Sequence, residues 1–229
     1  MSPGNACAQW MYGLSRSLGS PERAGGDKLQ SMPGELNVAV RPLTPSRWPD
    51  LESVFEARGC SIARGCWCMF YRESGRQAVP DGVRLADARK GQLKSLCDAG
   101  PPPGLLAYAG RKAVGWVTLG PRAQFLKLER SPVMKRVDDV PVWSIVCFVV
   151  PPEFRHRGVA TALLRGAIEF ASGRGARVLE AYPVDKAERG RDDWIWHGAL
   201  SMYEKAGFSE VARRRPGRPV VRLELEKAR

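Results

Sequence analysis

The longest hydrophobic stretch of the chain, 142–150, reads Val-Trp-Ser-Ile-Val-Cys-Phe-Val-Val. A run this rich in β-branched and aromatic residues is typical of a strand that is buried on both faces. Pro151 and Pro152 follow and end the strand, because proline has no N–H to donate to a neighbouring strand. Over 161–172 the apolar residues recur at helical spacing. The pattern therefore predicts a buried strand, a turn and an amphipathic helix.

Strand and helix patterns alternate along the rest of the chain. The predicted strands cover 36–41, 105–109, 113–119, 176–184, 209–214 and 220–225, and the predicted helices cover 44–58, 81–99 and 194–206. Segment 121–131 is a short basic helix or a loop, and periodicity cannot decide whether 60–72 is a strand or a helical turn. Turns containing glycine indicate two hairpins. We expect an α/β fold with helices on both faces of the sheet.

Composition divides the chain into two parts. Residues 1–35 are rich in Gly, Ser and Pro and show little periodicity, so we expect a flexible N-terminal extension. Residues 36–229 form the expected folded domain. No apolar run has the length of a membrane span, and the N-terminus lacks the apolar core of a secretory signal. These features predict a cytoplasmic protein that does not interact with membranes.

The turn 155–160, between the central strand and the following helix, is suited to bind an anion. The first N–H groups of a helix have no acceptors within the helix and carry partial positive charge. Gly158 and Ala160 carry little side-chain bulk, so a phosphate can approach the backbone. Arg155 and Arg157 add full positive charges. The turn therefore predicts a site for a pyrophosphate.

Two motifs resemble those of one known family. The order V-x-P-x-x-R-x-x-G-x-A, from Val150 to Ala160, resembles the acetyl-CoA signature of the GCN5-related N-acetyltransferases (GNAT). The block from Gly198 to Phe208 is similar to the last motif of that family, in which a helix carries a tyrosine, here Tyr203, shortly before Gly-Phe. The chain has neither a P-loop nor a G-x-G-x-x-G fingerprint at the turn.

The resemblance implies a fold and a co-substrate. The implied fold is a mixed, mostly antiparallel sheet of six to seven strands, splayed in the middle. It implies acetyl-CoA as the co-substrate, no metal, and a bulge in the fourth strand that leaves backbone groups unpaired for pantetheine. The implied pantetheine contacts are Cys147, Phe148, Val149 and Val150, and the implied phosphate contacts are Arg155, His156, Arg157, Gly158, Val159, Ala160 and Thr161.

The resemblance also suggests catalytic residues. Tyr203 matches the tyrosine that protonates the leaving thiolate or holds it by a hydrogen bond. Glu180 is the candidate base, weighed together with Tyr182 and Ser144, while an amine that loses its proton to solvent would need no base. Because segment 60–72 corresponds to one wall of the family's acceptor cleft, Trp67, Phe70 and Tyr71 are candidate acceptor contacts. Tyr182, on the strand after the central helix, is a further candidate.

Charge leaves the alternatives open. The net charge of +12 suits a polyanionic cofactor as well as nucleic acid. No RNA-binding motif is present, so nucleic acid is the minority interpretation. The sequence favours an N-acetyltransferase that acts on a primary amine of a small molecule, peptide or protein. The alternatives are an acyl-CoA sensor without turnover and an acetylase associated with RNA or aminoacyl-tRNA. The acceptor is not identified, and a homodimer is left open.

The cysteines favour reduced thiols over a metal site. Cys60, Cys66 and Cys68 form a cluster, but the chain has only two histidines to complete a four-ligand zinc site, and these lie far away in the sequence. The other cysteines are scattered rather than arranged as a disulfide framework. We expect no metal.

Overall fold

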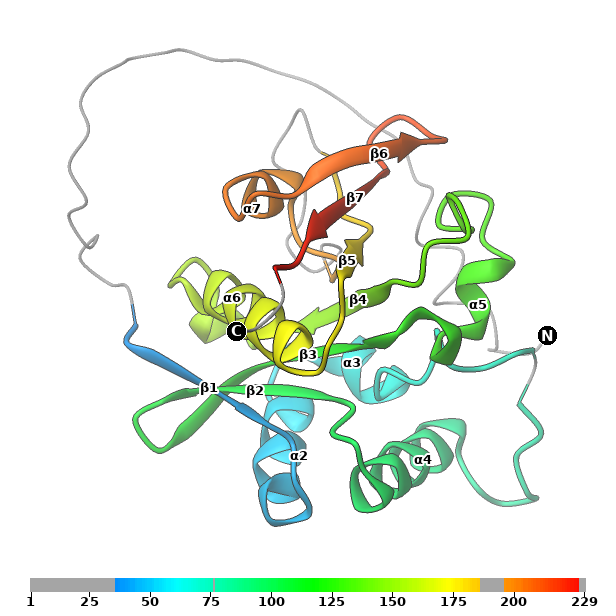
Figure 1. The fold of residues 1–229 in the computed structure, drawn as a ribbon. Helices are drawn as coiled ribbons and strands as arrows, with labels where there is room; N and C mark the ends of the chain where they lie inside the picture. Colours follow the sequence, from blue (N-terminus) through cyan, green and yellow to red (C-terminus); the bar gives the residue numbers. More distant parts are fainter. Residues whose placement is uncertain (1–35, 76, 186–195, 227–229) are drawn as a thin grey trace, which may run out of the picture.

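The computed structural model describes residues 36–75, 77–185 and 196–226. The strands within these residues are β1 (Val38–Pro42), β2 (Gly104–Ala109), β3 (Lys112–Pro121), β4 (Trp143–Val149), β5 (Val178–Ala181), β6 (Ser209–Arg213) and β7 (Pro219–Glu224). Among the described residues they form a single seven-stranded sheet in the order β1-β2-β3-β4-β5-β7-β6 (Figure 1). Only β4 and β5 are parallel in this sheet. The mixed, mostly antiparallel sheet predicted from the sequence is confirmed.

The helices precede or connect these strands. The α-helices are α2 (Trp48–Glu56), α3 (Ser61–Cys66), α4 (Leu85–Ala99), α5 (Leu126–Glu129), α6 (Val159–Gly173) and α7 (Leu200–Glu204), and short 3₁₀ helices cover Pro45–Arg47, Arg122–Gln124 and Pro152–Phe154. The central strand and helix agree with the hydrophobic pattern of the sequence. Segment 121–131, which the sequence left open, contains two short helical turns.

Helices cover both faces of the sheet, as the alternation along β2 shows. Leu105 and Ala107 belong to the core cluster that contains the apolar face of α6. Leu106 and Tyr108 point the other way, into the cluster that contains the buried residues of α2. Successive side chains of a strand lie on opposite faces, so one strand contributes to both cores. Figure 1 shows α6 on one side of the sheet and α2 and α4 on the other.

The sheet opens between β4 and β5. These strands pair over only three positions, from Trp143 with Leu179 to Ile145 with Ala181. On its other side, β4 shifts register against β3, because consecutive residues of β3 pair with Ile145 and Cys147 and leave Val146 between them. Val146 is therefore a β-bulge, which bends the strand at the point where β5 diverges. The bulge and the splay both lie where the family resemblance implied them.

Two predicted helices differ from the observed ones. Within the described part of the predicted helix 194–206, only α7 is an α-helix. The residues before it instead form backbone hydrogen bonds with Val184, which lies shortly after β5 in the sequence. Val184 donates to the carbonyl of Gly198, and Leu200 donates to the carbonyl of Val184. Gly198 also has a φ of 79°, which interrupts a right-handed helix. The helix predicted from 81 begins at Leu85, after a turn.

Segment 60–72 proves to be mostly helix and turn. It forms α3, and the residues that follow are turns in which Trp67 and Cys68 have positive φ values of 46° and 50°. The predicted N-terminal extension 1–35 lies outside the described residues. Within the described part of the chain, no helix is both long and apolar enough to span a membrane.

Candidate active site

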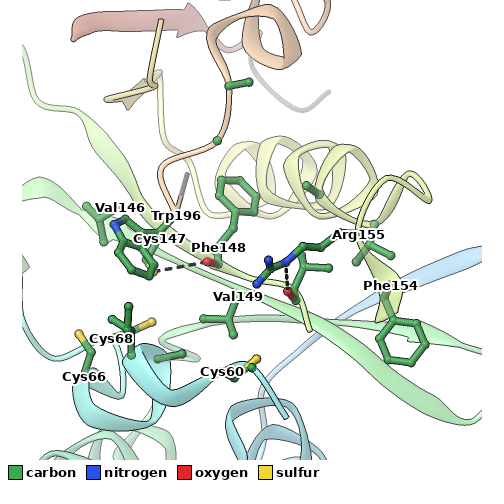
Figure 2. A pocket seen from close by; sticks show the side chains of 18 of the residues that line it. Cys60, Cys66, Cys68, Val146, Cys147, Phe148, Val149, Phe154, Arg155 and Trp196 are labelled. Carbon is green, nitrogen blue, oxygen red and sulfur yellow. Dashed lines mark hydrogen bonds between the residues drawn. The ribbon is translucent and has the colours of Figure 1, made fainter. Parts of the chain in front are cut away.

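A cavity of about 570 Å³ lies at the splay of the sheet. Its walls come from α3 and the turn after it, from β4, from the first turn of α6 and from the segment that leads into α7. Figure 2 shows Cys60, Cys66 and Cys68 on one side of it, with β4 and Arg155 across from them. The volume is in the range of small-molecule sites. All the predicted cofactor contacts line this cavity except Arg157.

The first turn of α6 faces the cavity. Gly158 caps the helix with a left-handed φ of 80°, a conformation that costs a side-chain-bearing residue free energy. The helix then begins with the Ala162 N–H donating to the Gly158 carbonyl at 2.9 Å. The N–H groups of residues 159–161 precede this bond, so they have no acceptor within the helix, and all three residues line the cavity. This part of the cavity is suited to an anion.

Arg155 places a second positive group beside the helix start. Its Nε donates to the Val150 carbonyl at 3.1 Å, which fixes the direction of the guanidinium (Figure 2). Both residues line the cavity. The end of β4 and the turn before α6 are therefore joined by a side chain that also brings charge to the site.

The edge of β4 differs from the expected row of unpaired backbone groups. The Phe148 N–H donates to the Trp196 carbonyl at 2.6 Å. The Val150 carbonyl already accepts from Arg155. The segment before α7 therefore lies along the strand where the family resemblance implied pantetheine, and a ligand that paired with the Phe148 N–H would replace the Trp196 carbonyl.

Tyr203 lies immediately behind the cavity wall. Its side chain is fully buried, and its hydroxyl donates to the His197 carbonyl at 2.8 Å. Burial raises the pKa of the Tyr203 phenol well above its usual range, and the neighbouring Cys147 adds to the effect. Gly198 does line the cavity, and a Cβ placed on it would lie 3.6 Å from the Tyr203 hydroxyl. The absence of a side chain at Gly198 therefore brings the phenol close to the cavity.

Glu180 is held in a buried network. Its side chain is 1% exposed, and it accepts hydrogen bonds from Arg122 at 2.9 Å and from Arg222 at 2.8 Å. The Tyr182 hydroxyl donates to the same carboxylate at 2.6 Å and lies 2.9 Å from the Ser144 hydroxyl. None of these residues lines the cavity. The candidate base Glu180 and its two alternatives are thus hydrogen-bonded to one another behind the cavity, and none of their side chains faces it.

The aromatic residues of the 60–72 segment divide between core and cavity. Trp67 is 2% exposed and stacks on Phe55, with ring centroids 4.7 Å apart. It packs in the core between the sheet and α2 and does not line the cavity, contrary to the expectation that it contacts the acceptor. Phe70 and Tyr71 do line the cavity. The positive φ values after α3 turn the chain between the two environments.

His197 is a candidate that the sequence analysis did not identify. It is 1% exposed, and its Nε2 lies 2.9 Å from the hydroxyl of Tyr71, a residue 126 positions away. Burial lowers the pKa of His197 well below its usual range, and the positive charge of Arg218 acts in the same direction. The sequence placed His197 six residues before Tyr203, but the hydrophobic pattern there does not predict that its side chain lies next to the cavity.

The described cysteines are not joined in disulfides, and Cys60, Cys66, Cys68 and Cys147 line the cavity. Among the residues that the structure describes, no group of three or more His, Cys, Asp or Glu side chains is arranged to hold a metal ion. The thiols therefore contribute soft, mostly apolar surface to the cavity.

Comparisons with solved structures find N-acetyltransferases that are similar to this chain at low sequence identity. A polyamine N-acetyltransferase of Drosophila melanogaster is 14% identical, with 82% of this chain and 100% of that chain covered and a TM-score of 0.48. A GCN5-related N-acetyltransferase of Kribbella flavida is 19% identical, with coverages of 82% and 98% and a TM-score of 0.47. The PaiA N-acetyltransferase of Thermoplasma acidophilum, solved with coenzyme A, is 14% identical, with coverages of 82% and 99% and a TM-score of 0.42.

Sequence comparison identifies the family. An uncharacterized N-acetyltransferase of Methanocaldococcus jannaschii is 38% identical over 61 residues, which span 27% of this chain and 23% of that protein. The chain thus matches about a quarter of the length of this curated relative. The profile of the acetyltransferase (GNAT) family matches residues 67–208, which include α4, β2 to β5 and α6 and end after α7. The chain belongs to the acetyltransferase (GNAT) family.

Proposed function

We propose that this protein transfers an acetyl group from acetyl-CoA to a primary amine. The observation that carries the proposal is the cavity at the splay of the sheet, which a bulged strand borders on one side and the start of α6 borders on another. The two features supply different kinds of contact. The helix start offers N–H groups to phosphates, and the strand edge offers backbone groups to an extended amide chain.

The residues of the cavity fit the chemistry of coenzyme A. The N–H groups of Val159, Ala160 and Thr161 would hold the pyrophosphate, with Arg155 adding charge. The edge of β4 at Phe148 would pair with the pantetheine arm in place of the Trp196 carbonyl. When bound, the thioester supplies the activated acetyl group. The other expected cofactor contacts, apart from Arg157, also line the cavity.

Catalysis at this site would rest mainly on the positions of the reactants. Two reactants that are held together react as an effectively unimolecular pair, which removes a large entropic part of the barrier. Tyr203 would serve the leaving thiolate from behind Gly198 by turning its hydroxyl away from the His197 carbonyl, to which it donates at 2.8 Å. Burial keeps the phenol protonated, so it has a proton to donate. The thiolate of a thiol with a pKa of about 8.5 is a modest leaving group, so one well-placed hydrogen-bond donor is sufficient to stabilise it as it leaves.

A charge substitution in the first turn of α6 tests the phosphate assignment. Ala160→Glu places a carboxylate among the proposed phosphate contacts, while an acidic residue at a helix start favours the helix itself. Binding of CoA and acetyl-CoA, measured by calorimetry, should weaken at least about tenfold, which corresponds to about 1.4 kcal/mol. The matched control is Ala162→Glu, in the same helix but not among the residues that line the cavity, and it should bind as the wild type does.

Release of free thiol in the presence of primary amines tests turnover separately. The wild type should release CoA in proportion to acetylated amine, identified by mass spectrometry. Binding of acetyl-CoA with no turnover over a broad panel of amines would instead indicate an acyl-CoA sensor. Equal CoA affinity in Ala160→Glu and the wild type would refute the phosphate site.

A further inference from the structure

The Tyr71–His197 pair connects two walls of the cavity. Tyr71 lies in the turn after α3, on the wall that the sequence predicted for the acceptor. His197 lies in the turn before α7, directly after Trp196, whose carbonyl contacts β4. The Tyr71 hydroxyl and His197 Nε2 are 2.9 Å apart, and the two rings meet edge to face with centroids 5.6 Å apart. Tyr71 lines the cavity, and His197 lies behind it.

The direction of the Tyr71–His197 hydrogen bond depends on which ring nitrogen of His197 carries the proton. The ring is neutral, because burial and the charge of Arg218 both disfavour the imidazolium, so it has one N–H and one lone pair. Nδ1 is buried and has no hydrogen bond of standard geometry among the described residues, whereas Nε2 lies 2.9 Å from the Tyr71 hydroxyl. With the proton on Nδ1, Nε2 accepts the hydrogen bond from Tyr71.

This arrangement fixes the polarity of the Tyr71 hydroxyl. A phenol has one proton to donate and lone pairs with which to accept. When its proton points to His197 Nε2, the Tyr71 oxygen can only accept from a ligand in the cavity. A neutral primary amine has N–H groups to donate and a lone pair with which to attack. An N–H bond to Tyr71 therefore orients the amine without occupying that lone pair.

We propose that Tyr71 is a catalytic residue that accepts an N–H hydrogen bond from the acceptor amine, and that His197 is the positioning residue that keeps the Tyr71 oxygen an acceptor. This inference rests on the proposed acetyl transfer and assigns the residues that hold its nucleophile. The cavity favours the neutral amine, because no described residue that lines it is Asp or Glu. Phe70 meets Tyr71 edge to face, with centroids 5.1 Å apart, and adds an apolar surface.

Tyr71→Phe tests the pair by removing only the hydroxyl. With phenethylamine, putrescine and a peptide with a free N-terminus as probes, kcat/KM for the best amine should fall about fivefold, because one neutral hydrogen bond contributes about 1 kcal/mol. The affinity for acetyl-CoA should not change. Tyr108→Phe is the matched control, since that hydroxyl bonds to Asp50 at 2.7 Å and its residue does not line the cavity.

Two variants of His197 separate positioning from packing. His197→Gln keeps an acceptor near Nε2 and should retain more activity than His197→Leu, which offers none. A purely structural role of His197 would make their activities follow their stabilities, and this outcome would overturn the positioning assignment. Thermal melts of both variants, measured beside the kinetics, decide between these outcomes.

Nitrogen-15 NMR of the free protein gives a readout that does not depend on activity. The chain has two histidines, so substituting His156 assigns both ring signals. His197 should remain neutral, with its proton on Nδ1, from about pH 6 to pH 8, and Tyr71→Phe should mix the two tautomers. A proton on Nε2 in the wild type would overturn the inference. Unchanged amine kinetics in Tyr71→Phe would do the same, whereas a wild type without turnover would refute the proposed function itself.

Discussion

Glu180→Gln distinguishes a structural carboxylate from a catalytic base. In the structure, both oxygens of Glu180 are occupied, Oε1 by Arg122 and Tyr182 and Oε2 by Arg222. The substitution keeps the shape of the side chain, removes its charge and replaces one acceptor oxygen with an NH₂ donor. Two arginines that are 6% and 10% exposed then lose their common buried anion.

The expected effect is a large loss of stability. Removing one partner of a buried ion pair costs about 3–5 kcal/mol, because the remaining charge stays desolvated. In a domain of this size each kcal/mol lowers the melting temperature by about 2–4 °C. Glu180→Gln should therefore melt about 6–20 °C below the wild type. Because Asp138 also bonds to Arg222, part of the charge is still compensated, which favours the lower half of this range.

Calorimetry and kinetics together test this reasoning. The matched control is Glu129→Gln, because Glu129 also pairs with Arg122, at 3.1 Å, but its side chain is 44% exposed. Such a surface pair contributes about 0–1 kcal/mol, so the control should melt within a few degrees of the wild type. At a temperature where Glu180→Gln is folded, its kcat per folded molecule should be close to that of the wild type. A variant of normal stability that has lost its turnover would refute the structural role and restore Glu180 as the base.

Two further predictions concern Tyr203 and Glu73. Tyr203→Phe should lower kcat with little change in acetyl-CoA affinity, because it removes the proposed donor to the thiolate; stopped-flow turnover at the wild-type rate would remove that role. Glu73 is 4% exposed, and although burial alone would raise its pKa, hydrogen bonds from Arg89 and Lys127 outweigh burial and lower it. Since its folded pKa lies below its unfolded value of about 4.3, its contribution to stability is present above that pH and is lost as pH falls through the folded pKa. Urea unfolding from neutral pH to about pH 3 should show a smaller acid-dependent loss in Glu73→Gln than in the wild type, and equal slopes would contradict the assignment.

The sequence by itself determined the central strand, the following helix and the turn between them. The run 142–150 became β4, and the helical pattern from 161 became part of α6. These elements are specified locally, because a continuous apolar run and a repeat of about 3.6 residues each favour one backbone conformation. The proposed anion site at the start of α6 could be predicted for the same reason, since a helix start presents its N–H groups wherever the helix lies.

Only the tertiary structure decided which side chains reach the cavity. Trp67 and Phe70 are both aromatic and lie three residues apart, yet one packs in the core and the other lines the cavity. The positive φ values of the turn after α3 separate them, and hydrophobicity carries no information about that turn. Glu180 was a plausible base from its strand alone, but its role depends on two arginines that come from a distant loop and from β7.

The contact between His197 and Tyr71 shows most directly what local sequence patterns cannot predict. Their contact spans 126 positions of sequence, and neither residue belongs to a periodic pattern that would bring them together. The sheet brings them together, because the bulge at Val146 and the early divergence of β5 open a space that the turns at both residues enter. Local patterns fix the backbone of each element, whereas long-range packing fixes the distances between side chains, and the chemistry of the site depends on those distances.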